Sequence, residues 1–435
     1  MAIPNPPSRH EFCPRRTSLT ADPPAKTGPR DDKKDFHLQL PQNPPIALWP
    51  RRAASIAVLV VIMLAGARGQ TAGQASQGQA AQQPPKKELM AEDVYKNIQV
   101  LRGVPENQFL ATMGFFSASI GESCEFCHDD ESSWAGYAKD NEHKQTARKM
   151  ILMMNALNKT YFGGARKLTC YSCHRGTDFP KVTPDLAQQY SAPVVDEPDV
   201  IAEQAAGAPS ADQILDKYIQ ALGGTQRLAA IISFVAKGTY QGYAEVDKSG
   251  IEIMAKAPGQ RVTIIHTSNG DGTTTYDGRT GWVAEPGRPV PLLELTGEFL
   301  EAVKADADLA FPGRIKQSFS QWRVGFSSDI NGREVEVVQG NSGGGFAVKL
   351  YFDKETGLLV RQVRYTNSPV GLNPTQIDYS DYRDVSGVKM PFRWTTTWTD
   401  GRAVTALAEI QANVAIESAK FGKPDPAAAG QPARR

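Results

Sequence analysis

Hydrophobic residues recur at helical spacing between residues 90 and 180. The first predicted helix covers residues 91–102, where one face would carry Val94, Ile98 and Leu101. The second covers residues 106–119, with Pro105 in front of it and Gly121 at its end. The third covers residues 141–158, where one stripe carries Ala147, Met150, Ile151, Met154 and Leu157. We therefore expect a small all-α domain over residues 90–180.

Beyond residue 180 the pattern changes twice. Residues 181–210 are rich in Pro, Ala, Asp and Gln without a period, which is typical of a linker. A short helix is then predicted at 214–222, a longer one at 293–310, and strands at 251–255, 261–266, 335–338, 347–352, 358–364 and 393–398. Because short turns such as Asn331-Gly332 join consecutive strands, the sheet should be mostly antiparallel. We predict a multidomain protein: the all-α domain, then an α+β domain with a curved, mostly antiparallel sheet over residues 211–420.

The two ends of the chain differ from this body. Residues 1–52 are Pro-rich and charged, and we predict a disordered lead. Residues 53–67 form an apolar run after two arginines, which is typical of a signal peptide or of an uncleaved signal anchor, and shorter than a membrane span of about 20 residues. Residues 68–89 are predicted to be a linker and residues 421–435 a disordered tail. We expect export to the periplasm or another extracytoplasmic space, with anchoring to the inner membrane if residues 53–67 are retained.

Composition narrows the classes of function. The chain has 435 residues with 38 Gly and 30 Pro, which fits two folded units joined by linkers. Its formal net charge of +1 gives no reason to expect nucleic-acid binding, which needs a clustered basic face. Cys13 lies in the lead and receives no role.

The other four cysteines fall in two copies of the pattern C-x-x-C-H. The first copy is Cys124, Cys127 and His128, and the second is Cys170, Cys173 and His174. Two thiols three positions apart can form thioethers to the two vinyl groups of one haem, and the following His can reach the iron. The sequence therefore predicts two haem c groups, with the four cysteines as attachment points and the two histidines as axial ligands.

Paired cysteines also occur in three other kinds of site. A zinc site usually has its two pairs about 15–20 residues apart, closer than Cys124 is to Cys170, and needs no His after each pair. A redox C-x-x-C normally sits at a helix start after a strand, where neither copy is predicted to lie. Structural disulfides are permitted by export. Haem attachment explains the two histidines best.

Each haem iron also needs a sixth ligand, or an open position if it binds a small molecule. Met113 lies on the predicted helix before the first motif, and Met150 lies on the helix before the second. A Met ligand raises the potential and blocks exogenous ligands. Both residues could instead fill the core, since Met is a common filler and other methionines share the third helix. His143 is a further candidate, although a lone His between charged residues is more often solvated.

These segments resemble the cytochrome subunit bound to photosynthetic reaction centres. The resemblance spans residues 90–180 and is carried by residues 95–101, Met113, the first motif, residues 147–150 and residues 169–176. That family binds four haems as two pairs of helix-plus-motif repeats, and this chain resembles one pair. In the family a Met on the preceding helix is the sixth ligand of three haems, which implies Met113 and Met150 here. Nothing matches the His that serves one haem of the family.

This departure means that a role as reaction-centre donor is not implied. A two-haem electron carrier that exchanges electrons with redox partner proteins fits better, and we expect a carrier rather than a catalyst. Two alternatives stay open: a peroxidase-like haem enzyme with an open distal site, and a redox-sensing protein that binds an apolar ligand.

The strand-rich part offers little chemistry of its own. It has no Cys, and its one His, His266, ends an alternating strand and is expected to be packed or at the surface. Core packing is the favoured interpretation of Trp282, Trp322, Trp394 and Trp398, which could also line an apolar pocket. The turn-bearing stretches 276–282 and 381–391 resemble the half-barrel of periplasmic lipoprotein carriers. That resemblance implies a concave sheet able to hold an acyl chain, a lipid or a partner segment.

Overall fold

The computed structural model describes residues 88–128, 134–191, 198–242, 247–342 and 344–425. The predicted lead with Cys13, the apolar run 53–67, almost all of the linker 68–89 and residues 426–435 of the tail lie outside this range. No helix within the described residues is long and apolar enough to cross a membrane.

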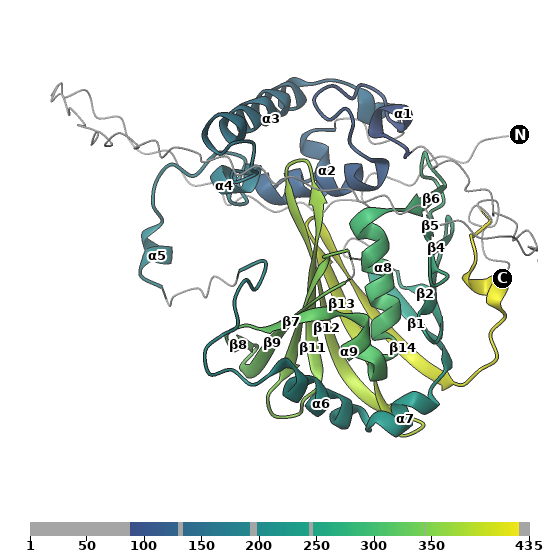
Figure 1. Cartoon of the computed structure of the whole chain (residues 1–435). Helices are drawn as coiled ribbons and strands as arrows, with labels where there is room; N and C mark the ends of the chain where they lie inside the picture. Colours follow the sequence, from purple (N-terminus) through teal and green to yellow (C-terminus); the bar gives the residue numbers. More distant parts are fainter. Residues whose placement is uncertain (1–87, 129–133, 192–197, 243–246, 343, 426–435) are drawn as a thin grey trace, which may run out of the picture. The chain divides into compact units, whose positions relative to one another are not determined.

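The cysteine-bearing part of the chain is helical (Figure 1). Its elements are α1 (Ala91–Val94), α2 (Glu106–Ile120), η1 (Cys124–Phe126), η2 (Gly136–Ala138), α3 (Glu142–Tyr161) and α4 (Cys170–His174). The second and third predicted helices are confirmed. Helix α2 ends at Gly121, whose φ of 72° lies in the left-handed region that glycine adopts easily. Helix α3 begins after Asn141, whose side chain accepts the backbone N–H of Lys144 at 2.9 Å.

The first predicted helix is wrong beyond Val94. The chain folds back at this point, because the N–H of Ala91 donates to the carbonyl of Val104 at 2.8 Å. Asn97 in the returning loop has a φ of 61°, which an α-helix excludes. Two residues of the predicted stripe, Ile98 and Leu101, still reach the core, so their spacing reflects burial in a compact loop.

The strand-rich part of the chain contains one antiparallel sheet of 14 strands within the described residues. Its strand order is β6-β5-β4-β3-β2-β1-β14-β13-β12-β11-β10-β9-β7, with β8 paired to β9. The strands are β1 (Ser233–Gly242), β2 (Ser249–Lys256), β3 (Gln260–Thr267), β4 (Gly270–Tyr276), β5 (Gly281–Ala284), β6 (Leu292–Leu295), β7 (Ser320–Val324), β8 (Ser328–Ile330), β9 (Arg333–Asn341), β10 (Ala347–Asp353), β11 (Leu359–Ser368), β12 (Gly371–Val385), β13 (Val388–Trp398) and β14 (Gly401–Ala412). All six strands expected from the sequence are present. The expected fold class, a helical part followed by a large curved antiparallel sheet, is confirmed.

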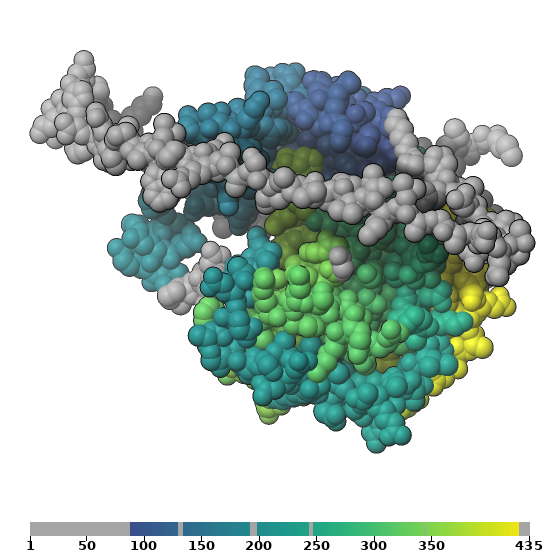
Figure 2. Space-filling view, viewed as in Figure 1, coloured from purple at the N-terminus to yellow at the C-terminus, as the bar shows by residue number. Residues whose placement is uncertain are grey.

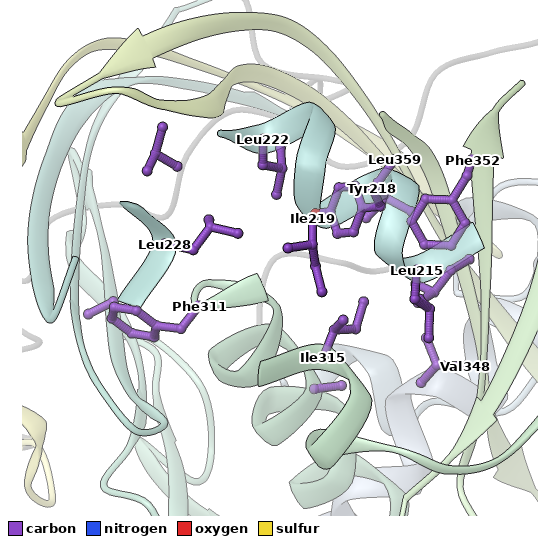
Figure 3. Close-up of a cluster of buried hydrophobic side chains, with 14 of the residues drawn as sticks. Leu215, Tyr218, Ile219, Leu222, Leu228, Phe311, Ile315, Val348, Phe352 and Leu359 are labelled. Atoms are coloured by element: carbon purple, nitrogen blue, oxygen red, sulfur yellow. The ribbon is translucent and has the colours of Figure 1, made fainter. Parts of the chain in front are cut away.

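Helices cover one face of this sheet and complete its core (Figure 1). They are α6 (Ala211–Leu222), α7 (Thr225–Ala230), α8 (Gly297–Leu309), η3 (Pro312–Arg314) and α9 (Ile315–Ser318). Helix α6 begins with a capping box between Ser210 and Gln213. It buries Leu215, Tyr218 and Leu222 against strand residues such as Phe352 (Figure 3). The predicted helix 293–310 starts later than expected, at Gly297, because β6 occupies residues 292–295.

The predicted linker is partly attached to the sheet. After α5 (Leu186–Gln189), Ile201 is 5% exposed and its N–H donates to the buried Gln339 side chain at 2.7 Å. Lys349, also buried, donates to the carbonyl of Pro198 at 2.9 Å. A Pro- and Ala-rich composition did not reveal these contacts, because they use backbone groups and side chains far along the chain.

The predicted tail begins with a buried residue. Phe421, in η4 (Ser418–Phe421), is fully buried with Met254 and Val262. This C-terminal segment contacts β3, and Figure 2 shows it in yellow beside the teal surface. The prediction of disorder is therefore wrong at Phe421.

Candidate haem-attachment site

The second C-x-x-C-H motif forms a single helical turn, α4. Positions i, i+3 and i+4 of a helix lie on one face, so Cys170, Cys173 and His174 share a side of this turn. Thr169 and Ser172 form a capping box at its start, and Arg175 ends it with a φ of 51°. The motif thus begins a helix, but no strand precedes it.

The first motif is also a tight turn. The 3₁₀ helix η1 covers Cys124–Phe126, and the backbone N–H of His128 donates to the carbonyl of Cys124 at 2.9 Å. The side chain of Asn141 donates to the carbonyl of Cys127 at 3.0 Å. The residue that caps α3 therefore also attaches the first motif to that helix.

Both motif histidines make the same kind of hydrogen bond. Nδ1 of His128 lies 3.1 Å from the carbonyl oxygen of Tyr137, and Nδ1 of His174 lies 3.0 Å from that of Thr177. A carbonyl oxygen only accepts, so each Nδ1 carries the proton and donates it. In a neutral imidazole the lone pair then lies on Nε2, which is the usual arrangement of a metal-ligating His.

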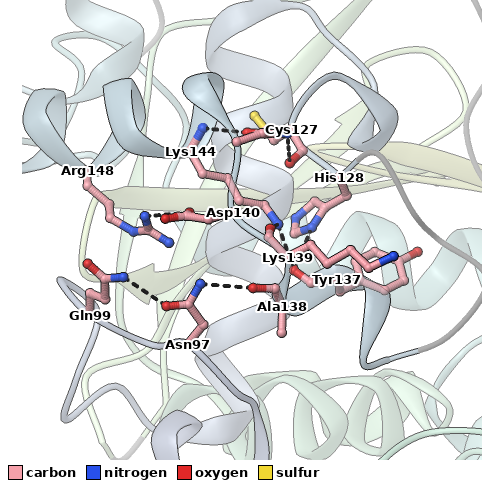
Figure 4. A network of polar contacts seen from close by, with 11 residues as sticks. Asn97, Gln99, Cys127, His128, Tyr137, Ala138, Lys139, Asp140, Lys144 and Arg148 are labelled. Atoms are coloured by element: carbon pink, nitrogen blue, oxygen red, sulfur yellow. Dashed lines mark hydrogen bonds and ion pairs between the residues drawn. The ribbon is translucent and has the colours of Figure 1, made fainter.

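A polar network surrounds the first of these histidines (Figure 4). The ammonium group of Lys144 donates to the same carbonyl of Tyr137 at 2.7 Å. Asn97 donates to the carbonyl of Ala138 at 2.9 Å, and Arg148 pairs with Asp140 at 2.6 Å. These contacts fix the 3₁₀ segment that supplies the acceptor of His128.

Asn158 on α3 holds the chain just before the second motif. Its side chain is buried, accepts the backbone N–H groups of Lys167 and Leu168 at 3.1 and 2.9 Å, and donates to the carbonyl of Leu168 at 2.8 Å. One amide group thus satisfies three backbone groups of the segment that leads into Cys170.

Two glycines join the end of α2 to the end of the second motif. The N–H of Gly176 donates to the carbonyl of Ser119 at 2.8 Å. A Cβ atom on Gly121 would overlap the carbonyl oxygen of Gly176. The helix before the first motif and the turn after the second can therefore approach closely only because Gly121 lacks a side chain.

The two predicted Met ligands lie in different environments. Met113 on α2 is partly buried and packs against the cluster that contains Phe109 and Ile151. Met150 on α3 is 37% exposed. One turn further along α3, Met154 is buried in the cluster that includes Cys170. The ligand roles of Met113 and Met150 stay predictions, and Met154 emerges as a rival to Met150 at the second motif.

The residues present fit a covalently bound haem. Each motif offers two thiols and an imidazole on one turn, and the adjoining helices α3 and α4 expose apolar side chains, with Met153 49% and Tyr171 54% exposed. Burial raises the pKa of the Cys170 thiol to about 11. The described part of the chain contains no group of three or more His, Cys, Asp or Glu that could hold a metal ion by itself.

The other candidates from the sequence have structural partners. His143 packs against Phe126 with ring centroids 4.0 Å apart. Nδ1 of His266 lies 2.9 Å from Oδ1 of Asp271 across the β3–β4 turn, and both side chains are partly exposed. Trp322 packs edge-on against Phe319. Core or surface packing, which the sequence favoured for these side chains, is what the structure shows.

Sequence reasoning missed the residues that support the motifs. These are Asn141, Asn158, Tyr137, Thr177 and Gly176. A helix-capping Asn is recognisable from sequence, so Asn141 could have been found. The others act through backbone atoms or long-range contacts and leave no local signal.

A cavity of about 320 Å³ lies in the strand-rich part, between the sheet and helices α6, α7 and α8. Figure 3 shows five of the residues that line it: Tyr218, Leu222, Leu228, Phe311 and Leu359. Of the four tryptophans, Trp394 lines it. The cavity has the size and apolar character of a small-molecule pocket.

Solved structures resemble this chain over about half its length. A DUF1329 family protein from Desulfovibrio piger is 11% identical with a TM-score of 0.36, covering 49% of this chain and 98% of that protein. A LolA superfamily protein from Nitrosomonas europaea is 14% identical with a TM-score of 0.36, covering 50% and 99%.

Curated relatives match about a fifth of the chain. The photosynthetic reaction center cytochrome c subunit of Roseobacter denitrificans is 34% identical over 101 residues, covering 21% of this chain and 27% of that protein. The subunit of Thermochromatium tepidum is 33% identical over 95 residues, covering 21% and 23%. The chain thus spans about a quarter of the length of these relatives. The resemblance seen in the motifs is confirmed, because residues 65–210 match the family model of the photosynthetic reaction centre cytochrome C subunit.

Proposed function

We propose that this chain is an exported c-type cytochrome that carries two haems and transfers electrons between redox partner proteins outside the cytoplasm. The observation that carries the proposal is the shared geometry of the two motifs: in each, Nδ1 of the motif His donates to a backbone carbonyl at 3.0–3.1 Å. Two structural histidines would have no common reason to present Nε2 beside a pair of thiols. The family match over residues 65–210 supports the same chemistry.

In this proposal each side chain has a defined role. Cys124 and Cys127 attach one haem and Cys170 and Cys173 the other, while His128 and His174 bind the irons through Nε2. Met113 and Met150 are the proposed sixth ligands. Bound haem supplies one-electron redox chemistry, and the protein sets its potential through the axial ligands and their hydrogen bonds.

The test is the optical and magnetic spectrum of the purified exported protein, with haem counted per chain. Wild type is compared with Met113→Ala, Met150→Ala and Met154→Ala, and with Met153→Ala as the control from the exposed part of α3. We expect two covalent, low-spin haems. Met113→Ala and Met150→Ala should each convert one haem to high spin, and the control should convert none.

Other results would change the proposal in defined ways. Conversion by Met154→Ala alone would move the second ligand to Met154. A wild-type haem that is high-spin and binds carbon monoxide or peroxide would refute the carrier role at that site and favour the enzyme or sensor alternative. Fewer than two haems per chain would refute the two-haem assignment.

The cavity supports a second function in the same chain. Its walls come from β1–β4, β11–β14 and helices α6–α8, and most of the side chains that line it are apolar. Burial of an apolar ligand there would contribute about 25 cal/mol per Å² of apolar surface removed from water. We therefore include binding of an apolar or lipid ligand by the strand-rich part.

A further inference from the structure

Few charged side chains line the cavity, and their positive charges outnumber their negative charges. The charged residues that line it are Arg261, Asp306, Arg364 and Lys389. Lys389 is exposed, whereas the other three lie between β3, β11 and α8. This group thus contains two guanidinium groups and one carboxylate inside an apolar wall, which leaves an excess positive charge.

The single carboxylate is already used. Both Nη atoms of Arg364 bind the two carboxylate oxygens of Asp306, with Nη2 to Oδ2 at 3.0 Å, and Nη1 also donates to the carbonyl of Ala302 at 3.2 Å. Such a bidentate pair is the strongest arrangement that Arg and a carboxylate form. Asp306 therefore neutralises Arg364.

Within the described part of the chain, Arg261 has no such carboxylate partner. Its Nη1 donates to the backbone carbonyl of Asp306 at 3.0 Å, which is a neutral acceptor. A guanidinium has five N–H donors, so this bond leaves donors for a second acceptor. The strand register places Arg261 beside Tyr276 and on the same face of β3 as Thr263 and Ile265, all of which line the cavity.

Deeper in, the wall is apolar. Ile251, Phe234, Leu222 and Leu407 contribute to it from β2, β1, α6 and β14. A volume of about 320 Å³ holds about ten groups the size of a water or methylene, at about 30 Å³ each. A ligand that fits this cavity has a hydrocarbon tail of about that length and one negative charge.

We propose that the cavity binds a single-chain amphiphile with a carboxylate head, such as a fatty acid. The head binds the Arg261 guanidinium and the tail lies along the apolar wall. This proposal rests on the ligand-binding role given to the strand-rich part and is independent of the haems.

The experiment is calorimetric titration of the full haem-loaded protein with dodecanoate, dodecanol and dodecyltrimethylammonium, each at a concentration where it is monomeric in water. We expect dodecanoate to bind at least tenfold more tightly than dodecanol, and the cationic amphiphile to bind more weakly than either. Arg261→Gln should lower dodecanoate affinity at least tenfold and leave dodecanol affinity unchanged. Arg261→Lys should fall in between, because it keeps the charge but loses the fork of donors.

Arg279→Gln is the matched control, since Arg279 is exposed in the β4–β5 turn, and should change nothing. Equal affinity for dodecanoate and dodecanol, or an Arg261→Gln variant that still prefers dodecanoate, would refute the carboxylate head while leaving an apolar-ligand role. Absence of binding by all three amphiphiles would refute that role as well. The haem spectra report separately on the electron-carrier proposal.

Discussion

Replacing Gly121 by Ala tests how the two motifs are held together. Gly121 ends α2 with a φ of 72°, and a Cβ there would overlap the carbonyl oxygen of Gly176. Left-handed backbone costs a residue with a Cβ about 1–2 kcal/mol. Relief of the overlap must also move Gly176 away from Ser119, whose carbonyl it binds at 2.8 Å, at a further cost of about 0.5–1.5 kcal/mol. We expect Gly121→Ala to lower the free energy of unfolding by about 1.5–3.5 kcal/mol.

Gly163 provides the control for backbone strain alone. It has a similar φ of 61°, but a Cβ there would meet no atom within 4 Å. Gly163→Ala should therefore cost only about 1–2 kcal/mol. The assay is urea unfolding of the haem-loaded protein, followed by circular dichroism at the helical minimum and by haem absorbance in parallel.

The two variants separate the explanations. A larger loss for Gly121→Ala, accompanied by a change in the absorbance of the second haem, would support a contact that sets the position of the second motif. Equal losses in both variants would refute the reasoning, because the close approach to Gly176 would then contribute nothing beyond the cost of the φ angle.

Three further predictions follow. Asn158→Ala should lower the free energy of unfolding by about 2–4 kcal/mol, because three hydrogen bonds are lost, and should lower haem occupancy at the second motif. The control Asn155→Ala, at an exposed position of the same helix, should change neither. Unfolding curves and haem counts of the two variants test this. Burial raises the pKa of Asp308 to about 6, so the folded protein keeps a proton that the unfolded chain releases near pH 4, and stability falls as pH rises between these values. Asp308→Asn should flatten Tm between pH 4 and 6 and raise it at pH 7; an unchanged profile would contradict this. Lys144→Met should lower the midpoint potential of one haem only, measured by spectroelectrochemical titration; equal shifts of both haems, or none, would contradict it.

Local patterns predicted much of the architecture. The spacing of apolar residues predicted α2, α3 and six strands to within a few residues. The same spacing failed at residues 95–102, where the apolar side chains are buried from a loop. The predictions of a disordered tail and of a linker missed the burial of Phe421 and Ile201 for a related reason. Pro- and Ala-rich composition describes a whole segment, whereas the burial of one residue depends on which side chains pack against it.

The sequence likewise predicted some residues of the candidate site and missed others. The attachment residues lie close together in the sequence, so their C-x-x-C-H pattern could be recognised, and α4 places Cys170, Cys173 and His174 on one side of a turn. The acceptors of the two histidines are backbone carbonyls, which every residue possesses, and no sequence pattern distinguishes them. The choice between Met150 and Met154 depends on how α3 is rotated against α4, which helical spacing alone does not determine.

The two motifs are alike in sequence but differ in what accepts the histidine proton. The carbonyl of Tyr137 accepts from His128 and also from the ammonium group of Lys144. In the second motif the carbonyl of Thr177 accepts from His174, and the hydroxyl of Thr177 lies within hydrogen-bond distance of the carbonyls of His174 and Phe179. An acceptor shared with a cation attracts the Nδ1 proton less, so in the proposed two-haem protein His128 would be the less basic ligand. A less basic ligand stabilises the oxidised iron less, and the first haem should therefore have the higher potential. Electrons would then pass from the second motif to the first, a direction that follows from one lysine on α3 and that neither copy of C-x-x-C-H encodes.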